Sequence, residues 1–130
     1  MKRVYDFLEK SQTYYLSTIY VDKPKTRPFG TINLFEEKLY FLTGADKDVS
    51  KQMHKNQNIE ICAVHGDSWM RVSAKAILDK RKEPISSMLK KYSFLKANYS
   101  ADDDNTEVWY LKDATAVIYH FNEIKEVILF

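Results

Sequence analysis

Hydrophobic positions along this chain fall into two patterns, one typical of helices and one typical of strands. Near the start, Val4, Phe7 and Leu8 are spaced i, i+3 and i+4, which predicts a short amphipathic helix over residues 2–11. Two further helices are predicted along the chain, at residues 46–55 and 83–91. All three are short, so we expect them at the periphery of a structure built mainly from strands.

β-branched and aromatic residues dominate most of the remaining segments, as they do in strands. The predicted strands cover residues 13–21, 26–35, 38–43, 58–65, 69–79, 107–121 and 125–130. Glu36-Glu37 is expected to turn one hairpin, and Gly66-Asp67 another. Because successive strands are joined by short turns, the sheet is predicted to be mainly antiparallel.

Six or so antiparallel strands with a few peripheral helices predict a mainly β fold. In a chain of 130 residues this arrangement is expected to form one domain, residues 1–130. The predicted architecture is a small antiparallel Greek-key barrel. A chain of this length buries roughly two thirds of its unfolded surface, so a substantial core is available.

Composition narrows the classes of partner. The chain has 20 Lys+Arg against 18 Asp+Glu, a net charge of +2, so neither nucleic acid nor an anionic membrane is an expected partner. The single cysteine, Cys62, excludes an internal disulfide and a Cys-rich zinc site, and its apolar strand predicts a buried, inert thiol. With no apolar run of about 18 residues and no signal sequence, a cytoplasmic protein is expected.

The segment Lys25-Thr26-Arg27-Pro28-Phe29-Gly30 is the first candidate for ligand binding. The guanidinium fork of Arg27 is well matched to a phosphate group. Pro28 and Gly30 interrupt the regular ladder, which leaves backbone groups free to meet a ligand. The alternative is an exposed arginine on an edge strand.

A second group of candidates lies around the start of the second predicted helix. Lys47 and Ser50 fall in its first turn, where free N–H groups and the helix dipole favour an anion. Lys51 and Lys55 continue the same stripe. For Lys51 the alternative is a solvated basic face, and Lys55 is assigned to that solvated face. Thr43 ends the preceding strand, where its hydroxyl is available to a ligand. Together with the arginine segment, this group suits a phosphorylated ligand.

Aromatic side chains form a third group, around Trp69, Arg71, Trp109 and Tyr110. A tryptophan in a strand usually belongs to the core. The alternatives are a planar wall against a flat ring and a dimer contact. The strands carry more large apolar area than one small core hides, which predicts a homodimer.

The sequence contains no recognisable catalytic or metal-binding motif. The 3 histidines lie on different predicted elements without the spacing of a metal site. There is also no nucleophile elbow and no dinucleotide fingerprint. We therefore predict no metal site and assign no catalytic side chain.

Several short segments, taken in order and with their spacing, match one known family. They are residues 15–18, 24–30, 39–44, 49–53, 58–62, 69–72, 99–103 and 108–111. Over nearly its whole length the chain resembles the pyridoxamine 5′-phosphate oxidase-like family of FMN-binding split barrels. It is most similar to the short bacterial branch that includes the 5-nitroimidazole-reductase-like (Nim-type) proteins.

The resemblance implies a six-stranded antiparallel Greek-key split barrel and a homodimer with two FMN molecules at the subunit interface. The residues that it implies around the flavin are Arg27 and the backbone of Pro28, Phe29 and Gly30, with Thr43 in contact, Lys47, Ser50 or Lys51 on the phosphate, and Arg71 or Trp109 closing the site from the second subunit. The phosphate-binding Arg-Lys pair of the oxidases is not reproduced, since Asp48-Val49 falls near its place. Their C-terminal arginine segment is absent too, so oxidation of pyridoxamine phosphate is not expected.

The implied activity is that of an FMN-dependent oxidoreductase. FMN would pass electrons from a reduced nicotinamide to a small acceptor, and no side chain need act as nucleophile or base. Two alternatives belong to other classes. One is a flavin- or haem-binding module without turnover, such as a carrier or sensor, and the other is a structural β-barrel dimer without a cofactor.

Overall fold

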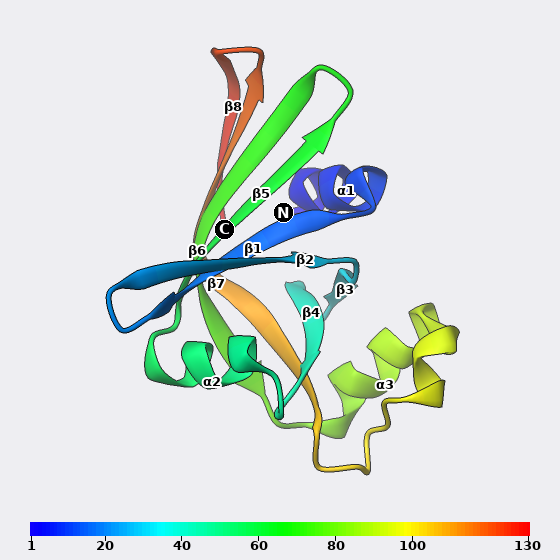
Figure 1. Ribbon diagram of the computed structural model, residues 1–130. Coiled ribbons are helices and arrows are strands. Elements are labelled where there is room, and N and C mark those ends of the chain that lie inside the picture. The colour runs from blue at the N-terminus through cyan, green and yellow to red at the C-terminus, as the bar shows by residue number, and fades with distance from the viewer.

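The computed structural model describes residues 1–130 and contains one twisted sheet with helices around it (Figure 1). In chain order the elements are α1 Lys2–Ser11, β1 Tyr14–Tyr20, β2 Lys23–Phe29, β3 Asn33–Phe35, β4 Lys38–Gly44, α2 Asp48–Lys55, β5 Asn58–His65, β6 Ser68–Asp79, α3 Lys82–Lys91, the 3₁₀ helix η1 Ser93–Ala97, β7 Thr106–His120 and β8 Glu123–Leu129. None of the helices is long and apolar enough to cross a membrane.

The sheet is antiparallel throughout and has eight strands in the order β2-β1-β5-β6-β7-β4-β3, with β8 also paired to β7. One edge of β7 is shared, because its first part pairs with β4 and its last part with β8. The prediction of six strands in a barrel is therefore wrong in two respects, since there are eight strands and the sheet is not closed. The mainly β, antiparallel class is confirmed.

The additional strand arises where one strand was predicted at residues 26–35. The backbone between β2 and β3 is bonded by tyrosine hydroxyls rather than by a neighbouring strand. The hydroxyl of Tyr14 donates to the carbonyl of Thr31 at 2.6 Å, and the N–H of Ile32 donates to the hydroxyl of Tyr92 at 3.1 Å. These bonds satisfy backbone groups outside the ladder, so the segment divides into two strands.

The inner face of the sheet carries the main core. Strand residues from β1, β4, β5, β6 and β7 pack there with α1 on one side and α2 on the other. The alternation of the strands sends Leu16, Ile61, Met70, Val72 and Ala116 inward, and all five are buried. In α2 the predicted core stripe is confirmed, because Val49 and Met53 are buried.

The outer face of the sheet has two halves. Near β3, β4 and the start of β7, the helix α3 covers it and buries a second cluster of side chains. The buried members of this cluster are Tyr40, Leu42, Ile85, Met88, Leu89 and Val108. A polar lock lies at its margin, where the hydroxyl of Tyr40 donates to Asp79 at 2.8 Å and Arg81 donates to both oxygens of the same carboxylate.

The other half of the outer face, across β1, β5, β6, β7 and β8, has no helix over it. We call this half the bare face. Its half-buried or exposed apolar side chains are Tyr15, Val64, Trp69, Val117, Tyr119, Ile124, Val127 and Leu129. The predicted burial of Cys62 is wrong, because this residue lies between the inward-facing Ile61 and Ala63 and therefore points outward.

Candidate functional site

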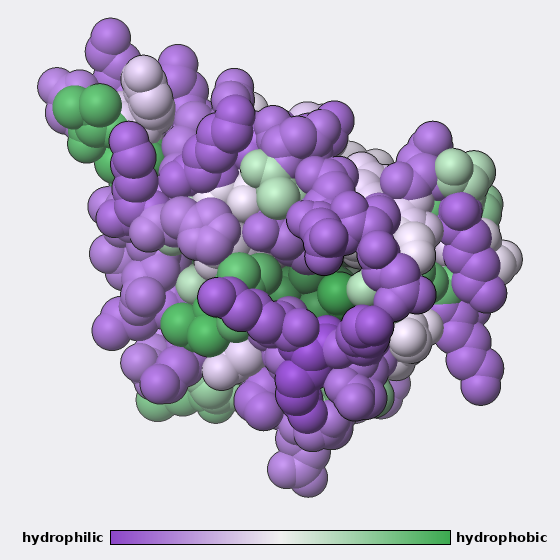
Figure 2. All heavy atoms as spheres, turned by 90° about the horizontal axis from the view of Figure 1, so that it is seen from below, coloured by the Kyte–Doolittle hydropathy of each residue, from purple (hydrophilic) through white to green (hydrophobic).

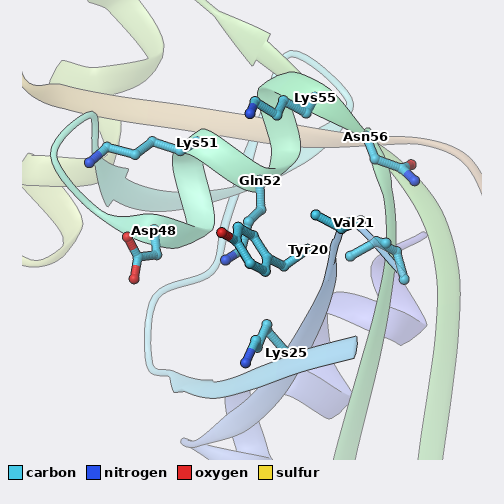
Figure 3. A pocket seen from close by; sticks show the side chains of 9 residues that line it. Tyr20, Val21, Lys25, Asp48, Lys51, Gln52, Lys55 and Asn56 are labelled. Atoms are coloured by element: carbon cyan, nitrogen blue, oxygen red, sulfur yellow. The ribbon is translucent and has the colours of Figure 1, made fainter. Parts of the chain in front are cut away.

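A groove runs between the β1–β2 hairpin and α2, and we call it the hairpin groove. Its volume is about 590 Å³, which lies within the usual range for small-molecule sites. The lining residues are Ile19, Tyr20, Val21, Lys25, Asp48, Lys51, Gln52, Lys55 and Asn56. Figure 3 shows Lys51 and Lys55 along α2 and Lys25 across from them on β2, with Gln52 and Tyr20 between. In the view from the side of α2 and α3, hydrophilic residues border a narrow apolar strip (Figure 2).

Arg27 lies beside this groove and is held in place by hydrogen bonds. It pairs with Leu16 of β1 across the ladder, which puts its half-buried side chain on the side of the sheet that faces α2. Nη1 donates to Thr18 Oγ1 at 2.8 Å, and Nη2 donates to Gln52 Oε1 at 2.9 Å. Desolvation by burial lowers the pKa of Arg27, while nearby Asp48 acts in the opposite direction. An arginine stays charged under such shifts, so Arg27 is a fixed cation beside the groove.

Gln52 fixes this geometry from the α2 side. Its side-chain oxygen accepts a second hydrogen bond, from Thr18 Oγ1 at 2.5 Å, and both Thr18 and Gln52 are buried. The guanidinium therefore has a single preferred orientation before any ligand binds.

The groove carries an excess of positive charge. Lys25, Lys51 and Lys55 form no ion pair or side-chain hydrogen bond, and the carboxylate of Asp48 has no partner either. Three lysines and one aspartate give the lining a formal charge of +2. Lys55, which the helix stripe placed on a solvated face, thus belongs to the groove. These free ammonium groups are suited to an anion.

The remaining candidates around α2 occupy different positions. Lys47 is exposed and precedes the first residue of α2, so it flanks the groove at the start of the helix. Ser50 is buried and donates to the carboxylate of Glu107 at 2.6 Å, so its hydroxyl already has an internal partner. Thr43 is buried on β4 directly opposite Glu107 on β7. Of these three side chains, only that of Lys47 is free at the surface.

The segment after Arg27 is partly exposed. Pro28 and Gly30 are exposed where β2 ends, whereas Phe29 is half-buried. The ring of Phe29 stacks on Tyr14 at 6.1 Å between centroids and meets Phe41 edge-on at 5.3 Å. The segment therefore anchors its aromatic side chain among the core residues. The expected interruption of the ladder at Pro28 is wrong, because Pro28 stays paired with Tyr15 and β2 continues to Phe29.

Arg71 and Trp109 are not brought to the groove within one chain. Arg71 lies on the bare face, where its guanidinium sits 5.1 Å from the ring centroid of Trp69 and 5.8 Å from that of Tyr119. Trp109 is buried, and its Nε1 donates to Glu107 at 3.0 Å. Both tryptophans were expected in the core, but only Trp109 is there, since Trp69 is half-buried on the bare face.

Sequence reasoning missed Tyr20, Val21, Gln52 and Asn56 as parts of a site, and it named Lys25 only as the start of the arginine segment. One signal for Lys25 was present, because in a strand it shares a face with Arg27. Gln52 and Tyr20 had no comparable signal. They belong to the site only because α2 packs beneath the β1–β2 hairpin.

Comparisons with known proteins place this geometry in context. No family model and no curated protein matches the sequence. Among solved structures, a NimC/NimA family protein from Clostridium acetobutylicum superposes with a TM-score of 0.96 at 32% identity, covering 100% of this chain and 93% of that one. The chain belongs to the NimC/NimA family. The similarity extends over the hairpin groove, since it spans every element of the fold.

Two more distant structures show the fold alone. General Stress Protein 26 from Bacillus anthracis matches with a TM-score of 0.76 at 16% identity, over 99% of this chain and 97% of that one. A pyridoxamine 5′-phosphate oxidase-related, FMN-binding protein from Nostoc punctiforme matches with a TM-score of 0.66 at 13% identity, over 98% and 95%. The NimC/NimA family chain therefore shares its architecture with proteins related to pyridoxamine 5′-phosphate oxidase, as the sequence resemblance implied.

Proposed function

We propose that this protein binds FMN and uses it to pass electrons from a reduced nicotinamide to a small acceptor. Membership of the NimC/NimA family and the fold shared with an FMN-binding protein support the flavin. The observation that carries the proposal is the fixed cation Arg27 beside a groove whose lysines have no partner within the chain. That donor set fits a phosphate monoester.

The phosphate would be held at the end of the groove nearest the start of α2. A buried dianion needs compensating charge, because leaving it unpaired is costly. Both Nη atoms of Arg27 already donate within the chain, so Arg27 supplies its positive charge in a preset orientation, and Lys51 or Lys47 supplies the second charge. Asp48 lies in the same turn of α2 and counts against the phosphate, so at least two cations are required there.

The bound flavin would supply the redox chemistry, and the chain would supply placement and exclusion of water. Gln52 and Thr18 orient the guanidinium, and the exposed backbone at Gly30 offers groups to the ring system. None of the groove residues is a cysteine or a histidine, so none is a standard nucleophile or haem ligand. This favours a flavin over haem and is compatible with turnover carried by the cofactor.

The test is a set of FMN titrations with three proteins. Removing one partner of a buried charge pair costs about 2–5 kcal/mol, so Arg27→Ala should weaken FMN binding by roughly 30-fold or more. Riboflavin lacks the phosphate, so it should bind the unchanged protein more weakly and lose little further affinity on this substitution. Lys96→Ala, on the exposed side of η1 without an ion pair, is the matched control and should behave as the unchanged protein.

Two results would count against the proposal. If Arg27→Ala and Lys96→Ala bound FMN with equal affinity, the phosphate could not be bound by Arg27. Absence of any flavin absorbance in the purified protein, with no binding of added FMN, would remove the cofactor itself. Bleaching of the flavin band by NADH or NADPH separates an oxidoreductase from a carrier that binds flavin without turnover.

We further propose that the bare face joins two copies of the chain in a homodimer. Its apolar residues extend across five neighbouring strands, exposed on β1, β5 and β8 and half-buried on β6 and β7, so they form a continuous patch and not isolated surface hydrophobics. The charges on it are few and balanced, with Arg71 on β6 and Glu60 on β5. Such a face is complementary to itself under two-fold symmetry, which is the usual arrangement of a homodimer.

A further inference from the structure

We propose that the part of the hairpin groove farthest from the start of α2 binds the adenosine diphosphate group of a dinucleotide. This part is lined by Lys25, Lys55, Tyr20 and Val21. This inference rests on the proposed flavin function. In a flavoprotein, the dinucleotide would be either the nicotinamide electron donor or the adenylated form of the flavin. Both carry the same adenosine diphosphate chemistry.

Unpaired positive charge remains in this part of the groove when the FMN phosphate is bound. The FMN phosphate, held by Arg27 with Lys47 or Lys51, neutralises the cations near the start of α2. Lys55 lies in the last turn of that helix, and Lys25 faces it from β2 (Figure 3). Neither ammonium group has a partner in the chain, so two positive charges remain for a second anionic group. A diphosphate presents two such charges close together.

Tyr20 and Val21 form an apolar rim on this part of the groove. Tyr20 is 53% exposed and Val21 is 85% exposed, although both are large and adjacent at the end of β1. The ring of Tyr20 lies on the α2 side of the hairpin, near Gln52 (Figure 3). An exposed tyrosine face is a stacking platform for any base, and stacking of this kind tolerates many bases.

Backbone strain marks the same place. Val21 has a φ of 62°, which is unfavourable for a β-branched side chain. A glycine or asparagine would satisfy this turn at lower cost. Strained residues of this kind are concentrated at ligand sites, where the surroundings hold them in place. Here the strain keeps an apolar side chain at the rim of a charged groove, which is the combination that a base linked to a diphosphate requires.

The groove is also larger than the FMN phosphate needs. A volume of about 590 Å³ exceeds what a phosphate and its ribityl chain fill, and the groove continues past Arg27 along the whole of α2 to Asn56. The amide of Asn56 has both donors and acceptors, so it is suited to a ribose hydroxyl or a base edge. The groove thus presents a site for one phosphate near the start of α2 and, toward Asn56, two lysines for a diphosphate, with an aromatic platform between these sites beside Gln52.

The experiment uses ADP as the probe, titrated calorimetrically into the purified protein with its flavin bound. ADP should bind at least about tenfold more tightly than AMP, since AMP offers one phosphate to the two lysines. Lys25→Gln and Lys55→Gln should each weaken ADP by about five- to tenfold, and the affinity should fall with added salt. Lys96→Gln is the matched control and should leave ADP binding unchanged.

Two further variants isolate the platform. Tyr20→Ala should weaken ADP by about tenfold or more but leave inorganic pyrophosphate unaffected, because only the base stacks. Tyr20→Phe keeps the ring and should retain ADP affinity. Competition with ADP by NADH, NADPH and FAD, measured in turn, then identifies which dinucleotide places its adenosine diphosphate group in this site.

The outcomes separate this inference from the proposed function. Equal ADP affinities for Lys25→Gln, Lys55→Gln and Lys96→Gln would overturn the proposed ADP site. Displacement of FMN by ADP would also overturn it, because FMN and ADP would then share one site. Flavin absorbance is recorded in the same samples. Lysine-dependent ADP binding in a protein without any flavin would support the nucleotide site and contradict the flavin function. Bound flavin without ADP binding would support the flavin function and contradict the nucleotide site.

Discussion

The two halves of the outer face are built from the same sheet and are similarly apolar, yet only one of them is covered by the chain. Under α3, Tyr40, Met88 and Val108 are each 0% exposed. On the bare face, Val127 and Leu129 are 59% and 74% exposed. The strands alternate in both places, so the difference does not come from strand pattern. It comes from which part of the sheet the α3 segment reaches.

The polar residues of the two halves also differ, because those of the covered half are paired within the chain and Arg71 on the bare face is not. The covered half is closed by Asp79, which accepts hydrogen bonds from Tyr40 and Arg81. On the bare face Arg71 has no carboxylate partner and lies against Trp69 and Tyr119. The covered half has therefore satisfied its polar groups within the chain, while the bare face keeps both apolar surface and an arginine for a partner. Aromatic residues and arginine are the types that contribute most at interfaces.

The largest expected effect tests the bare face directly. Val127→Asp places a carboxylate on β8 within the proposed interface, where it would be buried without a partner. We expect the dissociation constant of the dimer to rise more than about 100-fold, equivalent to roughly 3 kcal/mol. Light scattering and sedimentation at micromolar concentration measure this change.

The control for that substitution is Phe94→Asp, at a residue that is 73% exposed on η1 and outside the bare face. It should leave the association unchanged. A monomeric unchanged protein at micromolar concentration, or a Val127→Asp variant that dimerises normally, would show that the bare face does not join two copies.

A smaller effect is expected from the polar lock of the covered half. Hydrogen bonds from Arg81, opposed by burial, lower the pKa of Asp79 to about 2, from its usual value near 3.8. A lowered carboxyl pKa stabilises the fold above the unfolded pKa, and that stability is lost as the pH falls from about 4 to about 2. At neutral pH this contributes about 2 kcal/mol to the free energy of unfolding.

Urea unfolding of the unchanged protein and of Asp79→Asn, at a fixed protein concentration, measures this contribution. The difference in unfolding free energy between the two should be largest above pH 5 and should shrink as the pH approaches 2. A difference that stays constant over this range would mean that the carboxylate charge is not what closes the covered half.

The smallest effect is expected at Cys62, on the bare face. The thiol is exposed in the single chain and is small, so it adds little contact area to the proposed interface, and Cys62→Ala should change the free energy of unfolding by no more than about 1 kcal/mol. Thermal unfolding and flavin absorbance measure the two relevant quantities. Loss of flavin or of turnover with an intact fold would show that the thiol has a functional role.

The elements that depend on local sequence could be predicted. The hairpin at Glu36-Glu37 is confirmed, with Phe35 paired to Lys38 and both glutamates at positive φ. The amphipathic helix α1 was equally visible, because Val4, Phe7 and Leu8 form its buried stripe. In these cases the residues that determine the structure are neighbours along the chain.

The errors arose where distant residues decide the outcome. The division of the strand predicted at 26–35 depends on the hydroxyl of Tyr92, far along the chain. The exposure of Cys62 depends on which face of β5 meets the core. The apolar residues on both sides of Cys62 in the sequence do not indicate which face that is. The candidate site follows the same rule. Arg27 and Lys51 could be proposed from their chemistry, but Gln52 and Tyr20 join them only through packing of α2 on the hairpin.

The open sheet has a further consequence at β2, one of its edges. An unpaired edge is a template on which another chain can add a strand, and that is a common route to aggregation. Pro24 and Pro28 lack the N–H that an incoming strand would need, and Lys23 and Lys25 bring positive charge to any second copy that approaches edge-on. The β2 segment that helps to form the groove therefore also protects the chain against fibrillar growth from this edge.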